Sequence, residues 1–420
     1  MEFKTIKGFR DILPEEAVTW QHLDLEARCL LAAFGFKELK PPLLERTELF
    51  SRSIGEETDI VAKEMYSFAD RKGRMLTLRP EATASVVRAY IQHRLHDEQP
   101  TQKLFTIGPM FRHERPQKGR FRQFHQIDVE IIGDPGPKSD ADIIVVAMEL
   151  LHRLDMADAA LQINSLGCPE CRPGFREELT RYLARRSASL CRDCQRRSKT
   201  NPLRVFDCKV EGCREVVSDA PSVLRFLCDD CQTHLSAVEG YLELVGIPFR
   251  LNHKLVRGLD YYTRTAFEIQ TDRLGSQNAI IGGGRYDGLV KKLGGPDHPG
   301  IGFAIGVERL VTLLSEGQKG PTTAPELYIA DLGPAAAKAA FRWAHALRRC
   351  GIWVEGSYSA GGLKAQMRKA DRLKAKRVLI VGDDELAAGR GILRDMKTKA
   401  QKEVDLNRVV DILKEEILSP

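Results

Sequence analysis

The sequence has no long hydrophobic run. None of its apolar stretches approaches the roughly 20 residues that a membrane-spanning helix needs, and the N-terminal MEFKTIKGFRD lacks the apolar segment of a secretory signal. We therefore expect a cytoplasmic protein that does not enter a membrane. The sequence also lacks the GxxxxGK[ST] phosphate loop, which disfavours a Walker-type ATPase. Hydrophobic content of 43% and charged content of 29% exclude a disordered chain.

Ten cysteines are present, and eight of them lie within one short stretch of the chain. In a cytosolic protein such cysteines indicate metal ligands or free thiols rather than disulfides. They form the pairs Cys168/Cys171, Cys191/Cys194, Cys208/Cys213 and Cys228/Cys231. Thiolates at these spacings suit tetrahedral, structural Zn²⁺. Four pairs allow two sites in three combinations, and the spacing does not choose among them. Reduced thiols without metal are the alternative.

The length of 420 residues predicts two or three domains. Residues 1–165 and 246–318 carry helical and strand patterns and are expected to form one domain. Residues 166–245 are rich in cysteine, arginine and short helical pieces, and are interpreted as an inserted module. The hydrophilic stretch 315–325 is a linker. Residues 326–420 alternate between strand and helix, which predicts a small α/β domain with mostly parallel strands.

Individual elements are expected from periodicity. A helix should begin after Asp11 as its N-cap and end at Gly35. The segment 36–44 should be a strand interrupted by Pro41 and Pro42, which fit an edge or interface strand. Further strands are expected at 75–78, 104–111, 126–132, 249–256 and 265–270, and a helix at 141–154. Residues 300–314 should run from a strand into a helix.

The segment 111–126, FRHERPQKGRFRQFHQ, is basic and aromatic. Its cations are Arg112, Arg115, Lys118, Arg120 and Arg122, and its aromatic rings are Phe111, Phe121 and Phe124. Arginine forks bind phosphate oxygens two at a time, and a flat ring accepts a base. The segment therefore suits a purine nucleotide with a polyphosphate. A basic surface hairpin is the alternative.

Four more segments are candidates for the same site. In TLRPEAT, Glu81 and Thr83 could bind an amino group or merely cap a helix. In LVRGLDYY, Arg257 is expected at the end of a strand, with adjacent tyrosines on opposite strand faces. The Gly-rich run 281–288 would let a ligand approach the backbone. In GIGFAIGVERL, Arg309 near a helix start would attract phosphate. The alternative places Glu308 and Arg309 on the surface.

Together these segments resemble those of the histidyl-tRNA synthetases, a family of class II aminoacyl-tRNA synthetases, and the resemblance covers essentially the whole chain. KPPLLERTELF, FRHERPQKGRFRQFHQ and GIGFAIGVERL are similar to the three class motifs. LVRGLDYY and GGGRYDGL resemble the two histidine-specific signatures. The implied fold class is α+β: a class II antiparallel-sheet catalytic domain with a helical, Cys-rich insertion, plus a C-terminal α/β anticodon-binding domain.

The resemblance implies roles around ATP. Arg112 would contact the α-phosphate and the substrate carboxylate. Glu114 would bind the adenine amino edge, and Phe124 would stack on the base. Arg120 and Arg309 would hold the outer phosphates.

It also implies a histidine pocket. Its residues would be Glu81, Thr83, Arg112, Gln126, Glu130, Arg257, Tyr261 and Tyr262. The Glu130 carboxylate could accept an imidazole N–H. Arg257 would stabilise charge as the histidine carboxylate attacks. Such a polar pocket rejects apolar analogues, so no editing domain is expected.

The implied function is that of a histidine–tRNA ligase, which activates L-histidine with ATP and Mg²⁺ and transfers it to the 3′ end of tRNA(His), releasing AMP and pyrophosphate. The segment around Pro42 implies a homodimer. The insertion would contact the acceptor arm of tRNA. The resemblance does not itself carry a zinc requirement. A regulatory subunit of ATP phosphoribosyltransferase is the alternative, but those relatives lack the anticodon domain and have eroded signatures.

Residues 326–420 carry most of the chain's net positive charge. Lys364, Arg368, Arg372 and Lys376 recur at four-residue intervals. If 362–376 is helical, they form one basic stripe. We expect this stripe to face RNA; a solvated helix face is the alternative.

Overall fold

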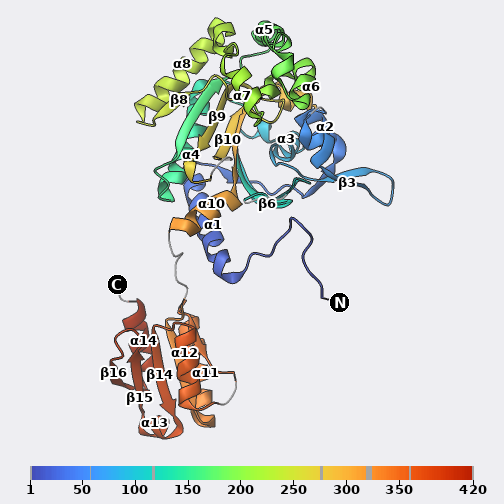
Figure 1. The fold of residues 1–420 in the computed structure, drawn as a ribbon. Helices are drawn as coiled ribbons and strands as arrows, with labels where there is room; N and C mark the ends of the chain where they lie inside the picture. Colours follow the sequence, from blue (N-terminus) through green and yellow to red (C-terminus); the bar gives the residue numbers. More distant parts are fainter. Residues whose placement is uncertain are drawn as a thin grey trace. The chain divides into compact units, whose positions relative to one another are not determined.

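The computed structural model describes residues 2–56, 58–115, 119–274, 278–317, 324–358 and 361–418. They form two compact units, Met1–Gly320 and Pro321–Pro420 (Figure 1). The boundary falls inside the stretch expected to be a linker, part of which lies outside the described residues. Lys118 of the basic segment also lies outside them.

The first unit is built on a large sheet, which has eight strands among the described residues. In spatial order they are β1 (Lys37–Glu38), β5 (Gln102–Phe111), β6 (Gln123–Ile132), β11 (Gly300–Gly306), β10 (Ala279–Arg285), β9 (Thr263–Gln270), β7 (Ala160–Ser165) and β8 (Phe249–Leu251). Neighbours are antiparallel except at the two edges, where β1 pairs with β5 and β7 with β8 in parallel. The predicted antiparallel sheet is confirmed.

Alternation along β6 divides its side chains between two environments. Ile127, Val129 and Ile131 point into the main apolar core. Helices α1 (Pro14–Ala33), α4 (Pro137–Arg153) and α10 (Val307–Gly317) contribute to the same core. The residues between these apolar ones in β6 therefore face the opposite side of the sheet, which is the side that carries the cavity described below.

Helix α1 ends as predicted but begins later. Its N-cap is Leu13, with no side-chain hydrogen bond, and Pro14 occupies the first turn. The prediction that Asp11 is the N-cap is therefore wrong: Pro14 suits the first helical turn because that turn needs no N–H partner. Gly35 follows the helix with φ of +78°, a left-handed conformation that favours glycine.

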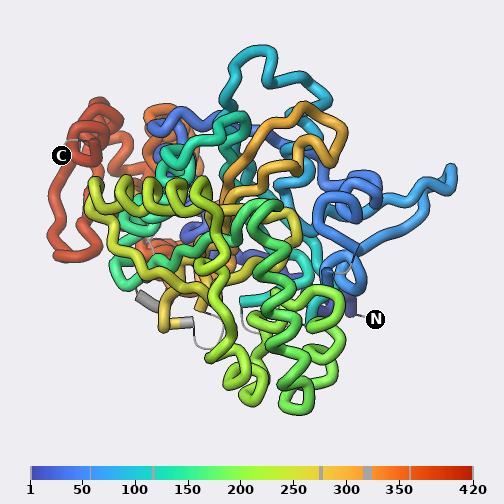
Figure 2. The backbone as a smooth tube through the Cα atoms, turned by 90° about the horizontal axis from the view of Figure 1, so that it is seen from above, coloured from blue at the N-terminus to red at the C-terminus, as the bar shows by residue number. Residues whose placement is uncertain are grey.

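A second sheet of the first unit has three strands among the described residues: β2 (Leu44–Arg46), β4 (Met75–Leu78) and β3 (Tyr66–Ala69). Helices α2 (Thr47–Ile54), α3 (Thr83–Gln92) and α9 (Leu289–Lys292) lie nearby, with a π-helical turn at Ile60–Glu64. The β3–β4 hairpin extends away from the rest of the unit in Figures 1 and 2. The segment 36–44 forms the edge strand β1 and then leaves the large sheet at the two prolines, as expected of an interrupted edge strand.

Between β7 and β8 lies the helical insertion. Its helices are α5 (Arg172–Ala184), α6 (Arg192–Thr200), α7 (Glu211–Ser218) and α8 (Asp229–Leu244), with short 3-10 turns at Ser187–Ser189, Pro202–Val205 and Val223–Phe226. Figure 1 shows these helices gathered at one end of the first unit. Their apolar side chains join the core of the sheet rather than forming a separate one. The predicted strand at 249–256 is shorter, because β8 ends at Leu251.

The second unit is a five-stranded sheet in the order β13 (Val354–Gly356), β12 (Leu327–Leu332), β14 (Arg377–Gly382), β15 (Arg390–Asp395) and β16 (Gln401–Asp405). Its helices are α11 (Pro334–Arg348), α12 (Leu363–Arg372), α13 (Asp383–Ala388) and α14 (Val409–Leu418). Only β13, β12 and β14 are parallel. The expectation of mostly parallel strands is wrong for β15 and β16, which form an antiparallel hairpin that joins β14 antiparallel.

The basic stripe of the second unit is shorter than predicted. Helix α12 ends at Arg372, so Lys364, Arg368 and Arg372 lie on it and are exposed. Lys376 lies beyond the helix and forms an ion pair with Glu326.

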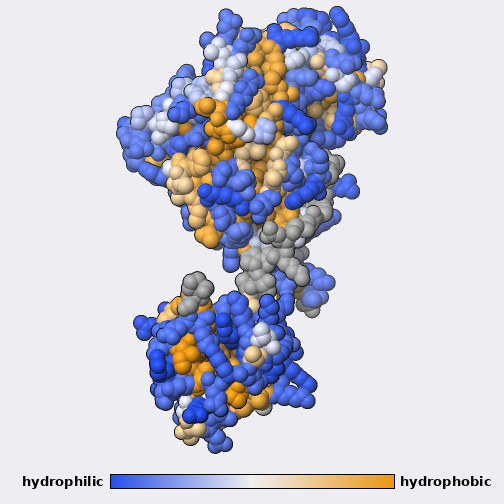
Figure 3. Space-filling model, turned by 90° about the vertical axis from the view of Figure 1, so that its left-hand side faces the viewer, coloured by the Kyte–Doolittle hydropathy of each residue, from blue (hydrophilic) through white to orange (hydrophobic). Residues whose placement is uncertain are grey.

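The face drawn in Figure 3 is mostly hydrophilic, with apolar residues gathered in patches on both units. Consecutive apolar side chains are exposed just after Pro41: Pro42, Leu43 and Leu44. Among the helices of the described residues, none combines the length and apolar character that crossing a bilayer requires.

Candidate active site

One cavity of about 290 Å³ opens on the large sheet of the first unit. It is lined by every residue expected to bind nucleotide or amino acid: Glu81, Thr83, Arg112, Glu114, Arg120, Phe124, Gln126, Glu130, Arg257, Tyr261, Tyr262 and Arg309. Strands β6, β10 and β11 supply its floor. Segments far apart in the sequence therefore meet in one hollow.

The basic segment contributes a cluster of guanidinium and aromatic groups. Arg112 follows the end of β5, and its Nε donates a hydrogen bond to the carbonyl of Pro80 at 2.8 Å. Its guanidinium carbon lies 5.2 Å from the ring centroid of Phe124 on β6. Nη1 of Arg120 donates to the Glu114 carboxylate at 2.9 Å. The alternative of a basic surface hairpin is therefore wrong for these four side chains, because all of them line the cavity.

Arg309 reaches the cavity from the first turn of α10. Its guanidinium donates to the carbonyl of Ala279 on β10. Burial, and then the nearby charge of Arg120, lower the pKa of Arg309. Cations that repel one another in this way form a site suited to a polyanion. The alternative that Glu308 and Arg309 lie on the surface is wrong. Glu308 is buried and accepts the backbone N–H of His125 on β6.

Three buried carboxylates line the same cavity: Glu81, Asp128 and Glu130. Burial raises the pKa of Glu130 to about 8. Burial, and then repulsion from Glu130 and Glu81, hold the pKa of Asp128 well above its usual range. Carboxylates that raise each other's pKa gain most from a cation bound between them. This part of the cavity is therefore suited to a positively charged or N–H-rich ligand.

Glu130 is held by two hydroxyl groups. Thr83 Oγ1 donates to one of its oxygens at 2.7 Å, and the Tyr286 hydroxyl donates to the other at 2.6 Å. Each oxygen retains a lone pair for a ligand. The pair Thr83 and Tyr286 thus fixes the carboxylate without exhausting its capacity to accept hydrogen bonds.

Glu81 both caps a helix and lines the cavity. Its carboxylate accepts the backbone N–H groups of Thr83 and Ala84 at the start of α3, each at 2.9 Å. The hydrogen bonds therefore show that Glu81 caps α3, which was the alternative to an amino-group ligand, while the same side chain also lines the cavity. Burial raises the pKa of Glu81, although these N–H groups oppose the shift. Capping fixes Glu81 and Thr83 in one arrangement at the cavity wall.

Two glycines of the cavity floor leave space for charged side chains. Gly302 on β11 faces Glu130 on β6, and a Cβ built on it would overlap the Glu130 carboxylate. A Cβ on Gly282 of β10 would likewise overlap the guanidinium of Arg257. The glycine-rich motifs are needed here because larger residues would displace these charged groups.

Arg257 lies in a loop and not at a strand end as predicted, because β8 ends at Leu251. Its Nη1 donates to the Glu268 carboxylate on β9 at 2.9 Å. Tyr261 and Tyr262 precede β9, and their ring centroids are 4.7 Å apart. The expectation that they occupy opposite faces of a strand is therefore wrong; both rings are buried in one apolar cluster.

Sequence reasoning missed three residues of this site. Asp128 shares the face of Gln126 and Glu130, so the alternation in β6 was a usable signal. Tyr286 lies within the Gly-rich run 281–288, and its hydroxyl donates a hydrogen bond to Glu130. Glu268, the partner of Arg257, had no local signal because their pairing depends on the tertiary fold.

The eight clustered cysteines lie outside this cavity. Their sulfur atoms form two groups, Cys168 with Cys171, Cys228 and Cys231, and Cys191 with Cys194, Cys208 and Cys213. The structure thus selects one of the three combinations that the spacing allows. Each group offers four ligand atoms within 4.8 Å of one another.

Comparison with models of protein families identifies the family of the chain. The family model described as histidyl-tRNA synthetase matches residues 8–310. The chain belongs to the histidyl-tRNA synthetase family. The model of the anticodon binding domain matches residues 326–416. These matches and the antiparallel sheet confirm the class II fold predicted for the first unit, and the predicted anticodon-binding domain of the second.

Individual relatives agree with the family. The histidine–tRNA ligase of Desulfosudis oleivorans is 56% identical over 405 residues, which are 96% of each chain. The crystal structure of apo S. aureus histidyl-tRNA synthetase is 34% identical, with a TM-score of 0.83 over 98% of this chain and 100% of that one. A Bacillus halodurans structure described as an ATP phosphoribosyltransferase regulatory subunit/histidyl-tRNA synthetase, 20% identical with a TM-score of 0.67, covers 91% of this chain and 99% of its own. At that identity the likeness is one of fold alone.

Proposed function

We propose that the cavity activates L-histidine with ATP and then transfers the histidyl group to the 3′ end of tRNA(His), releasing AMP and pyrophosphate. Histidine–tRNA ligase activity agrees with the family and with the 56% identical relative. One observation carries the proposal. Three guanidinium groups, of Arg112, Arg257 and Arg309, line the same cavity as the buried carboxylates.

ATP would bind along the guanidinium groups. Arg120 and Arg309 would hold the outer phosphates, and Phe124 would stack on the adenine. Glu114 would accept its amino group; in the free protein this carboxylate is paired with Arg120, so the pair would rearrange when ATP binds. Arg112, fixed by the Pro80 carbonyl, would contact both the α-phosphate and the histidine carboxylate.

Histidine would occupy the acidic part of the cavity. Glu130 would accept an imidazole N–H, with Tyr261 and Tyr262 enclosing the ring. Glu81, Thr83 and Gln126 would bind the α-amino group. A buried carboxylate of this kind leaves an apolar analogue with unpaired polar groups, which supports selection without editing.

The activation step is in-line attack of a histidine carboxylate oxygen on the α-phosphorus of ATP. A C–O–P linkage forms, the bond between the α-phosphorus and the bridging oxygen breaks, and pyrophosphate leaves. The protein need supply no nucleophile: it orients the reactants and neutralises charge. Arg257 would stabilise the developing charge, and its ion pair with Glu268 keeps the guanidinium in place. Mg²⁺ bound with ATP would neutralise phosphate charge, and the carboxylate of Glu268, which lines the cavity, offers an oxygen ligand of the kind it prefers.

Macromolecular partners follow from the remaining parts of the chain. We propose that the second unit binds the anticodon region of tRNA and that the insertion contacts its acceptor arm. The exposed Pro42, Leu43 and Leu44 form apolar surface of the kind that another chain covers, which supports a homodimer. A measurement of the molar mass in solution tests the proposed homodimer directly.

We further propose a cytoplasmic location and structural zinc in the insertion.

A histidine-dependent ATP–pyrophosphate exchange assay, followed by charging of a tRNA pool, tests the proposal. Exchange with histidine, and charging of only the histidine acceptor, are the expected results. Exchange supported equally by another amino acid would contradict the substrate assignment.

The alternative function, a histidine-binding regulatory subunit without ligase activity, has less support. The match to an anticodon binding domain over residues 326–416 is the observation against it. Histidine binding with no exchange activity would favour it.

A further inference from the structure

We propose that the insertion binds two Zn²⁺ ions, one in each cysteine group, and that these ions fix the loop carrying Arg257, Tyr261 and Tyr262. The first half of this inference depends only on the sulfur geometry. The second half, a role in histidine binding, rests on the function proposed above.

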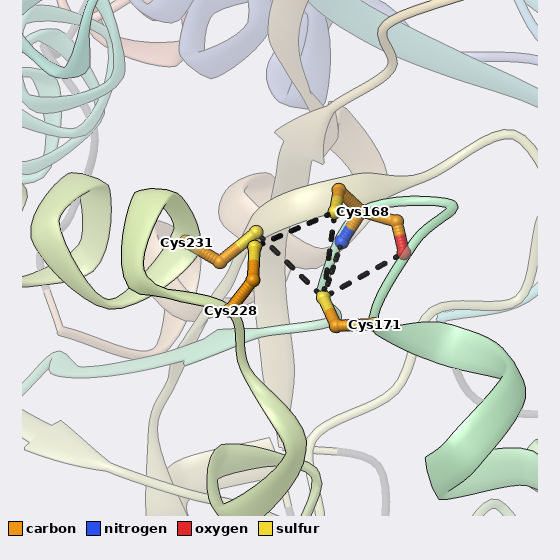
Figure 4. A group of neighbouring side chains, drawn as sticks. All are labelled: Cys168, Cys171, Cys228 and Cys231. Atoms are coloured by element: carbon orange, nitrogen blue, oxygen red, sulfur yellow. Dashed lines mark hydrogen bonds between the residues drawn. The ribbon is translucent and has the colours of Figure 1, made fainter.

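The first group joins the end of β7 to the start of α8 (Figure 4). The sulfur of Cys168 lies 3.5 Å from that of Cys171 and 3.8 Å from that of Cys228. The sulfurs of Cys171 and Cys231 are 3.8 Å apart. A tetrahedral zinc with bonds of about 2.3 Å to sulfur places its ligands about 3.8 Å apart. The side chains in Figure 4 converge on one such volume from two chain segments.

The backbone of this group is shaped around the sulfur atoms. The N–H of Cys168 points at the sulfur of Cys171, 3.1 Å away, and such a donor stabilises a thiolate ligand. Gly167 adopts φ of +70°, and a Cβ there would lie 2.8 Å from the Cys171 sulfur. Only glycine fits this turn without strain.

The second group repeats the arrangement within the insertion. Cys191 and Cys194 flank the start of α6, while Cys208 and Cys213 lie before and within α7. The sulfurs of Cys191 and Cys208 are 3.9 Å apart, and the N–H of Cys191 points at the sulfur of Cys213 at 3.2 Å. Four sulfur ligands leave no open coordination position, so both ions would be structural.

The first group connects to the candidate active site through one arginine. Arg172 directly follows Cys171 and starts α5. Its Nε donates to the carbonyl of Leu166 at 3.1 Å, and its Nη2 donates to the carbonyl of Tyr262. Because Tyr262 lines the cavity, a metal that fixes Cys171 would also fix one end of the loop.

The second group connects to the other end of the same loop. The segment between Cys194 and Cys208 contacts it twice. Nη2 of Arg204 donates to the carbonyl of Gly258 at 2.8 Å, and Nδ2 of Asn201 donates to the Asp260 carboxylate at 3.0 Å. The loop that carries Arg257 is therefore held from both sides by segments that the two cysteine groups close.

Metal analysis of the full chain, purified without chelator, tests the first half. Two zinc ions per chain are expected, and X-ray absorption at the zinc edge should show four sulfur neighbours at about 2.3 Å. Less than half a zinc per chain, one zinc per chain, or iron in place of zinc would overturn the assignment, as would disulfides found by thiol titration of the unfolded, unreduced chain.

Variants separate the two sites. Cys228→Ser with Cys231→Ser should lower the zinc content from two ions to one. Cys29→Ser with Cys350→Ser is the matched control, since both cysteines are exposed and outside the groups, and it should retain two. A control that also loses zinc, or a Cys228→Ser/Cys231→Ser protein that keeps both ions, would overturn the pairing.

Arg172→Ala tests the second half without removing a ligand. This variant should keep two zinc ions while its dissociation constant for histidine, measured by calorimetry, rises about tenfold or more, as expected for the loss of a charged hydrogen-bond donor. The KM for ATP should change less. Unchanged histidine affinity would overturn the positioning role. If the unmodified chain binds two zinc ions but no histidine, the proposed function fails while the metal assignment stands.

Discussion

Gly302 and Glu130 face each other across β11 and β6, and a Cβ on Gly302 would overlap the Glu130 carboxylate. The glycine of one strand therefore makes room for the carboxylate of the neighbouring strand. The space that a side chain on residue 302 would fill is occupied by the Glu130 carboxylate, which we propose binds the imidazole.

Gly302→Ala should consequently displace the Glu130 carboxylate and weaken histidine binding. We expect the KM for histidine to rise about 10- to 100-fold, the range for losing a hydrogen bond to a charged group. Gly240→Ala is the control, because a Cβ there meets nothing within 4 Å. Pyrophosphate exchange measured at varied histidine distinguishes the two variants; equal KM values would contradict the steric argument.

Glu130 should make the stability of the free protein depend on pH. Burial raises its pKa to about 8 in the folded state, above the value of the unfolded chain. The folded state therefore holds a proton that the unfolded state has lost, and stability falls as pH rises between the two values, by up to about 1.4 kcal/mol per pH unit. Glu130→Gln should remove this part of the pH dependence, whereas Glu98→Gln, at an exposed position, should keep it. Denaturant unfolding at several pH values between 5 and 9 is the measurement; parallel curves for the unmodified protein and Glu130→Gln would disprove the shift.

Arg257→Ala should abolish most activation while leaving the fold intact. Loss of a positioned charge in a transition state costs about 10²- to 10³-fold in rate, and Arg257→Lys should recover only part, since lysine cannot reproduce the guanidinium fork toward Glu268. Arg250→Ala, at an exposed position on β8, is the control. Pyrophosphate exchange near the unmodified rate in Arg257→Ala would remove this residue from the mechanism.

Asp128→Asn should weaken the binding of the histidine α-ammonium. The carboxylate is 1% exposed, its Oδ2 has no hydrogen-bond partner among the described residues, and its charge is repelled by Glu130 and Glu81. A bound cation would relieve that repulsion. We expect about tenfold weaker binding of histidine and of histidinol alike, because both carry the ammonium group, together with a more stable free protein. Calorimetry with both ligands checks this, and an unchanged dissociation constant for either would exclude a contact between Asp128 and the ammonium.

Replacing Lys364, Arg368 and Arg372 of α12 with alanine should weaken tRNA binding and spare histidine activation. Three lost phosphate contacts would flatten the salt dependence of binding by two to three units of slope, at about 0.7 to 0.9 per contact. Lys376→Ala is the control, because that residue lies beyond the helix and pairs with Glu326. An unchanged salt slope in the triple variant would indicate that this helix face is only solvated.

The sequence was sufficient for those parts of the site that have local signals. Alternating apolar residues located β6 correctly, and the glycine and arginine motifs located the cavity floor. The same alternation places Asp128 beside Gln126 and Glu130, but no motif drew attention to it. The sequence did not predict the backbone conformation of residues that lie outside helices and strands. Tyr261 and Tyr262 were expected on opposite faces of a strand, whereas they precede β9 in a loop whose Tyr262 carbonyl accepts a hydrogen bond from Arg172 of the insertion.

The sequence also did not predict which segments distant along the chain lie next to each other. Spacing within each C-x-x-C pair is a local property, but the choice of Cys228 and Cys231 as neighbours of Cys168 depends on where α8 returns to the sheet. The hairpin β15–β16 was missed for a related reason. Its strands carry charged residues on exposed positions, so their apolar alternation is weak.

The cap at the start of α3 has a practical consequence for redesign. Both oxygens of Glu81 already accept backbone N–H groups, so any attempt to change the preferred amino acid by altering this side chain would also loosen the helix that presents Thr83. Glu81 is also proposed to bind the α-amino group, which every amino acid carries. A library aimed at new substrates should therefore leave Glu81 fixed and vary Tyr261 and Tyr262, which are proposed to enclose the imidazole ring and which line the cavity.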